Sequence, residues 1–235
     1  MMLFKQLCNE VEPVSQLWDR RYGAIEILSH VALAWYDHSI QVTTIPSVKP
    51  DTDMHDYFVS GDFDEDEYPP DDVSVILDMV NSDGSKPIVW KSSQEMMGFL
   101  TRLAQVAAHE LLHRFQFVTK KHRALIGPYQ SQFADKHKRY LSTVYEIEAY
   151  AACIATDFAL EYGQGCGDYF GDWQWVKLSH VSPFFKEYAD LFGITHPVFD
   201  RLLLEINANI ELIERDNDVR FWTNLRECQR QWRPA

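Results

Sequence analysis

The chain has 235 residues, of which 46% are hydrophobic and 14% aromatic, so a packed core is expected and a disordered chain is excluded. Its 22 Lys and Arg against 35 Asp and Glu give a formal net charge of -13. That charge repels phosphate backbones, so nucleic acid is not an expected partner.

The first part of the chain predicts helix and then a small sheet. Apolar residues recur at helical spacing over 14–38 and predict either one helix or two joined at Gly23. Short runs rich in β-branched and aromatic residues follow. These runs predict strands at 40–45, 56–63, 73–80 and 86–90.

From Ser92 onward the pattern becomes helical. Residues 92–120 predict one long helix, with Ser92 or Ser93 as its N-cap. After a polar loop at 121–137, residues 139–162 predict a second long helix that ends at Gly163. The remainder, about 181–230, is also expected to be helical.

This order predicts an α+β fold, with no internal repeat and no low-complexity linker. We expect a single domain over 1–235 made of two lobes. The N-terminal lobe, 1–120, would hold the sheet and the first long helix. The helical C-terminal lobe would span 121–235.

The stretch "VAAHELLHRFQF" carries the chemistry. His109 and His113 are four residues apart, so on a helix they lie on one face with Cβ atoms about 5–6 Å apart. Two imidazoles at this spacing converge on one zinc ion. Glu110 is rotated about 100° from His109, beside the ion, where a general base would take a proton from a zinc-activated water.

A catalytic zinc needs a third protein ligand, and the stretch "YEIEAYAACIA" (145–155) of the second long helix offers two carboxylates, Glu146 and Glu148. Helical phase places Glu148 on an apolar face and Glu146 on a wetter one. A buried carboxylate must be paired or metal-bound, so Glu148 is the predicted ligand and Glu146 the alternative. His137, in the loop, is a lesser candidate. Gln116 and Asp157 are candidates to orient the metal-binding histidines by accepting hydrogen bonds from their other ring nitrogens.

HELLH followed by a helix with Glu-Ala-x-Ala resembles the zincin superfamily of zinc metallopeptidases, of the glutamate-ligand (gluzincin) type. The resemblance covers 105–157 and extends to the compact metallopeptidases of bacteria and their phages. It implies a zincin-like fold, one Zn²⁺ held by His109, His113 and Glu148, and Glu110 as general base. It also implies an edge strand, at 86–90 or 73–80, that binds extended substrate.

Two features depart from that family. The 34 residues between His113 and Glu148 exceed the gap in its shortest members, so the loop at 121–137 is an insertion. No family signature marks the residue that stabilises the oxyanion; the candidates are His180, Tyr145 and Tyr150.

The predicted function is zinc-dependent hydrolysis of peptide bonds in a protein or peptide substrate. The alternatives are a catalytically inactive zincin-fold protein that binds or regulates a partner, and hydrolysis of a non-peptide amide at the same metal site. The four cysteines form no CxxC pair, and neither a secretory signal nor a membrane span is visible. We therefore expect a cytoplasmic protein with no membrane partner.

Overall fold

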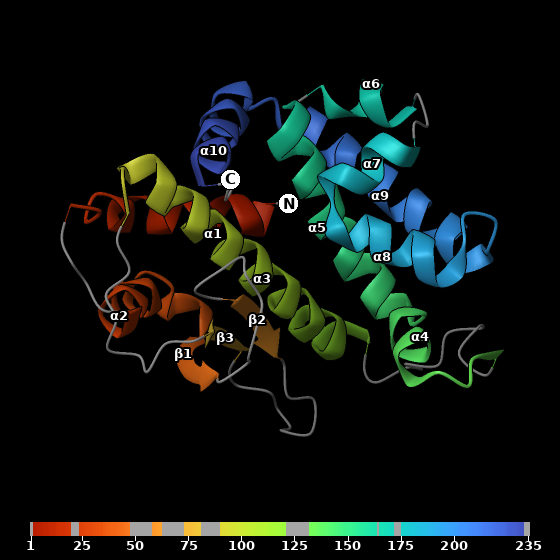
Figure 1. Ribbon diagram of the computed structural model, residues 1–235, viewed down its shortest axis with the longest axis horizontal. Helices are drawn as coiled ribbons and strands as arrows, with labels where there is room; N and C mark the ends of the chain where they lie inside the picture. The colour runs from red at the N-terminus through yellow and green to blue at the C-terminus, as the bar shows by residue number, and fades with distance from the viewer. Residues whose placement is uncertain are drawn as a thin grey trace. The chain divides into compact units, whose positions relative to one another are not determined.

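The computed structural model describes residues 2–19, 24–47, 58–62, 73–80, 90–120, 132–163, 165–171 and 175–232 (Figure 1). Its contacts divide the chain into two units. One comprises Met2–Arg114 with Glu227–Ala235, and the other Phe115–Arg226. The sequence predicts a boundary between the two lobes after residue 120. In the structure the boundary follows Arg114, and residues Glu227–Ala235 belong with the N-terminal unit. Apart from Trp90, the strand predicted at 86–90 lies outside the described residues, as does most of the predicted insertion, 121–131.

The unit formed by Met2–Arg114 and Glu227–Ala235 begins with helices α1 (Met2–Ser15) and α2 (Ala24–Ala34) and a short 3-10 turn, η1 (Tyr36–His38). Of the one or two helices predicted over 14–38, the structure has α2 at Ala24–Ala34, and residues 14 and 15 belong to the preceding helix, α1. Buried apolar residues of α1 recur every three or four positions, at Phe4, Leu7, Val11 and Val14. Trp35, fully buried after α2, donates its indole N–H to the carbonyl of Leu7 at 3.1 Å, which ties α2 to α1.

Among the described residues, this unit has a sheet of three strands in the order β1-β3-β2: β1 (Ile40–Ser47), β2 (Phe58–Asp62) and β3 (Val73–Val80). Strand β1 is parallel to β3, with Ile40 opposite Val73, whereas β2 is antiparallel to β3. The prediction that residues 73–80 form a substrate-binding edge strand is wrong, because β3 is the central strand and its backbone pairs on both sides.

Helix α3 (Ser93–Lys120) is the longest in the described chain, at 28 residues (Figure 1). Ser92 starts it as predicted, since its hydroxyl accepts a hydrogen bond from the backbone N–H of Glu95 at 3.1 Å. Gly98 lets helix α10 (Val219–Trp232) approach closely: a Cβ at Gly98 would lie 2.4 Å from Trp232 Cβ. Gln229 of α10 also donates to the carbonyl of Gly98 at 2.8 Å.

In the unit Phe115–Arg226, all regular structure of the described residues is helical. After the last residues of α3 come α4 (Lys136–Leu141), α5 (Val144–Tyr162), α6 (Cys166–Gly171), α7 (Trp175–Val181), α8 (Pro183–Phe192), α9 (Pro197–Asp216) and the first residues of α10. Helix α5 packs mainly against α9 and also contacts α4, α6, α7 and α8. It ends as predicted at Gly163, which has φ +79° and donates its N–H to the carbonyl of Ala159.

The predicted zincin-like α+β fold is wrong, because the chain is mostly helical. The three strands have only 8, 5 and 8 residues, and after Trp90 all regular structure in the described chain is helical. Helix α1 covers residues 2–13, where the sequence pattern predicts no helix, and adds to the helical share of the chain. In addition, among the described residues no helix combines the length and apolarity needed to cross a membrane.

Candidate metal centre

His109 and His113 lie one turn apart on α3, and both rings are half-buried. Their Nε2 atoms are 3.0 Å apart, and the rings meet edge to face with centroids 4.7 Å apart. A tetrahedral zinc with Zn–N distances of about 2.0–2.1 Å would place two nitrogens roughly 3.3 Å apart. The two side chains therefore already converge to nearly the separation that a shared zinc ion requires.

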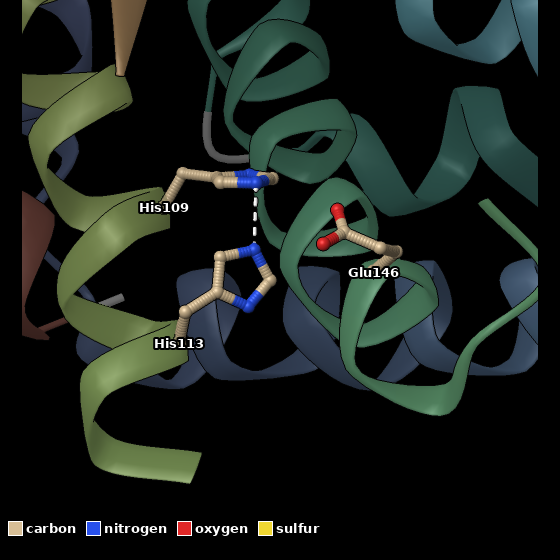
Figure 2. Close-up of side chains that lie close together, drawn as sticks. All are labelled: His109, His113 and Glu146. Atoms are coloured by element: carbon tan, nitrogen blue, oxygen red, sulfur yellow. Dashed lines mark hydrogen bonds between the residues drawn. The ribbon is translucent and has the colours of Figure 1, made fainter. Parts of the chain in front are cut away.

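Glu146 supplies the carboxylate nearest to this pair. It is the third residue of α5, and its position is fixed by the N-cap Thr143, whose hydroxyl accepts from the Glu146 backbone N–H at 3.2 Å. One ligand atom each of His109, His113 and Glu146 lies within 4.8 Å of the other two (Figure 2). Figure 2 shows the Glu146 carboxylate pointing from α5 toward the two imidazoles.

Glu148, the predicted third ligand, has another partner. It is half-buried, and its Oε2 accepts a hydrogen bond from Gln116 Nε2 at 2.8 Å. Glu146 is only 5% exposed, so the interpretation that Glu146 lies on a wet face of its helix is wrong. Buried residues follow one another along most of α5 without a clear gap, so this helix has no broad wet face.

Glu110 follows His109 directly on α3 and is 7% exposed. Its direction from the helix axis differs from that of His109 by about 100°, so it is next to the imidazole pair without sharing their face. A carboxylate in that position, in surroundings that exclude most water, is suited to hold a proton close to a metal site. Its role as the general base stays a prediction.

The two residues predicted to orient the histidines contact other groups. Gln116, 2% exposed, donates to Glu148 and, more weakly at 3.5 Å, to the backbone carbonyl of Tyr145. Asp157 accepts a 2.6 Å hydrogen bond from the hydroxyl of Ser182, which is the N-cap of α8. The contacts of Asp157 and Ser182 thus tie α5 to the start of α8.

The candidates for oxyanion stabilisation lie in different settings. Tyr145 is half-buried in the first turn of α5. Tyr150 lies one turn beyond Glu146 on the same face of α5, and its ring packs against Phe184 and Tyr188 of α8. His180 is exposed in the last turn of α7. The lesser ligand candidate, His137, is exposed and contacts Glu187 at 2.7 Å.

Tyr188 interacts electrostatically with Glu146. Its hydroxyl donates to the carbonyl of Leu141 at 2.9 Å, and its ring is completely buried. Burial raises the pKa of Tyr188 well above its ordinary value, and the negative charge of Glu146 raises it further. The environment of Glu146 thus combines low solvent exposure with aromatic neighbours, where electrostatic interactions are strong.

Comparisons with protein-family models, curated proteins and solved structures found nothing that matches this chain. The chemistry of the candidate centre therefore has to be judged from its own residues.

The residues fit a zinc ion in their donor chemistry. Two imidazoles and one carboxylate form a three-ligand set that leaves a coordination position for water or substrate, as in catalytic zinc sites. A closed structural site would need a fourth protein ligand, usually a thiolate. None of the four cysteines belongs to the group of side chains that could hold a metal in the described chain.

Proposed function

We propose that this protein is a zinc-dependent metallopeptidase built on a mostly helical scaffold. His109, His113 and Glu146 hold one zinc ion, and Glu110 is the general base. The observation that carries the proposal is the convergence of two imidazole nitrogens and one buried carboxylate within 4.8 Å, next to a second buried carboxylate. When bound, zinc lowers the pKa of water to about 7 and polarises a carbonyl group.

Each residue has a defined task. His109 and His113 would hold the ion through their Nε2 atoms, which lie 3.0 Å apart. Glu146 contributes a negative charge, and the bound cation would offset the free-energy cost of burying that charge. Glu110 accepts the proton released when water attacks the scissile carbonyl, and then delivers it to the leaving amine. The assignment of a peptide bond as substrate rests on the resemblance of HELLH to metallopeptidases.

The ligand set is tested by metal analysis of the purified protein. We expect one zinc per chain in the parent, none in His109→Ala or Glu146→Ala, and one in Glu148→Ala. His137→Ala is the matched control, because His137 is an exposed histidine outside the cluster and should leave the zinc content unchanged. Loss of zinc from Glu148→Ala but not from Glu146→Ala would assign the third ligand to Glu148 instead.

The hydrolytic step is tested with fluorescein-labelled casein and a quenched peptide library. The variant Glu110→Gln keeps the size of the side chain but cannot accept a proton. We expect it to retain zinc and to lose activity by about 10²–10⁴-fold. If zinc-loaded Glu110→Gln cleaves as fast as the parent, Glu110 is not the base. If the zinc-loaded parent hydrolyses neither probe, a metal-stabilised binding protein becomes the better description.

A reducing compartment, such as the cytoplasm, is part of the same proposal. Cys8, Cys153, Cys166 and Cys228 are all free and buried. Burial raises the pKa of the Cys8 thiol well above its ordinary value, which disfavours the thiolate needed for disulfide exchange.

A further inference from the structure

Gln116 lies three residues beyond His113 on α3 and connects that helix to α5. Its side chain is almost completely buried, at 2% exposure. Its amide nitrogen is 2.8 Å from Glu148 Oε2 and 3.5 Å from the backbone carbonyl oxygen of Tyr145. In the sequence of α5, these two acceptors flank Glu146 on either side. One side-chain amide therefore contacts the helical turn that carries the proposed third ligand.

The shorter of these contacts is the stronger one. A side-chain amide has two N–H donors, and a bond from one of them to an ionised carboxylate is roughly twice as strong as a bond between neutral groups. Because Gln116 is buried, little water competes for its amide. The contact to the Tyr145 carbonyl, at 3.5 Å, is at the limit of a hydrogen bond, so it contributes little energy and mainly orients the Gln116 amide.

Glu146 and Glu148 leave α5 in different directions, because two residues correspond to about 200° of rotation on a helix. One carboxylate can therefore take part in the metal group while the other is held by Gln116. This division explains why a helix that is buried along most of its length carries two carboxylates so close together.

We propose that Gln116 and Glu148 form a positioning pair for the metal centre. The pair holds the turn of α5 that carries Glu146 against the last residues of α3 and thereby orients the Glu146 carboxylate. This inference rests on the proposed function, since it assumes that those three residues bind the metal. Neither Gln116 nor Glu148 contacts the metal in this arrangement; each acts through the helix that carries a ligand.

The first test replaces the amide with an apolar side chain of similar length. We expect Gln116→Met to bind zinc at the same stoichiometry but about 10–100-fold more weakly in a chelator competition, the usual effect of losing a supporting contact. The visible spectrum of the Co²⁺-loaded variant should also change, because that spectrum reports ligand geometry. Gln105→Met is the matched control: Gln105 is also a buried glutamine of α3, but its amide oxygen accepts from Arg102. Its zinc affinity should stay within about threefold of the parent.

The second test exchanges the two groups. Gln116→Glu alone places two carboxylates together and should weaken zinc binding, and the added Glu148→Gln should restore it by rebuilding the pair with its ends reversed. A merely structural role would change thermal stability without moving the zinc affinity or the Co²⁺ spectrum.

The outcomes separate this inference from the proposed function. A parent protein that binds no stoichiometric zinc refutes the metal centre and the positioning pair together. A parent and a Gln116→Met variant that bind zinc equally tightly, with the same Co²⁺ spectrum, refute the positioning pair alone. Failure of the exchanged double variant to recover affinity also counts against it.

Discussion

The contact between Gly98 of α3 and α10 offers a quantitative test of the packing around the proposed metal-binding helix. We consider Gly98→Ala, which adds a single methyl group to a fully helical position. That methyl carbon would lie 2.4 Å from Trp232 Cβ and 2.8 Å from the backbone oxygen of Cys228. Non-bonded carbons normally approach to about 3.5–4.0 Å, so the two helices must separate by roughly 1 Å or more.

Two effects of opposite sign determine the expected change in the free energy of unfolding. Overpacking of this kind costs about 1–3 kcal/mol, and a position blocked by backbone and Cβ atoms, which cannot rotate away, belongs at the upper end. Alanine in a helix interior is favoured over glycine by about 1 kcal/mol. The balance predicts that Gly98→Ala lowers the free energy of unfolding by about 1–2 kcal/mol.

Urea denaturation followed by circular dichroism measures this change. Gly165→Ala is the matched control, because a Cβ at Gly165 meets no atom within 4 Å, and its effect should stay within about 0.5 kcal/mol. A Gly98→Ala variant that is as stable as the parent, or more stable, would refute the close approach of α10 to α3.

Three further predictions concern Tyr188, Ser182 and two buried cysteines. Tyr188→Phe should lower the free energy of unfolding in a urea titration by about 1–2 kcal/mol, because the buried Leu141 carbonyl loses the hydrogen bond from the Tyr188 hydroxyl. Tyr140→Phe, at an exposed position, is the control and should change this free energy little. Ser182→Ala should cost about 1–2 kcal/mol, since it removes both the cap of α8 and the hydrogen bond to Asp157; an unchanged thermal midpoint would contradict this. Burial raises the pKa of Cys166 to about 12 and that of Cys228 to about 11, against 9.0 for an unperturbed thiol. Just above pH 9.0 these two thiols ionise only in the unfolded state, so the free energy of unfolding should fall as the pH rises through this range. A Cys166→Ala, Cys228→Ala double variant should show a shallower fall in urea titrations.

The sequence was most informative where local signals act within one helix. The hydroxyl of Ser92 and the glycine at 163 define the start of α3 and the end of α5, and both act through hydrogen bonds to nearby backbone groups. The i, i+4 spacing of His109 and His113 likewise fixes their common face without any tertiary contact. These features depend on residues a few positions apart, so they can be predicted from the chain alone.

The choice between Glu146 and Glu148 depends on tertiary contacts, and helical phase could not make it. Phase identifies faces of α5, but it does not say which neighbouring helix covers each face. The capping pattern from Thr143 to Glu146 is a local signal that places Glu146 in the first turn of α5. The partner of Glu148, Gln116, lies 32 residues earlier in the chain, so no local pattern could reveal it.

The placement of residues Glu227–Ala235 with the N-terminal unit has a consequence for synthesis on the ribosome. The contact surface of Gly98 is completed by Cys228, Gln229 and Trp232, which are translated more than a hundred residues later. The unit Phe115–Arg226, by contrast, is one continuous segment and has all its residues as soon as Arg226 has emerged. The packing of α10 against Gly98 therefore forms only after Trp232 has been synthesised.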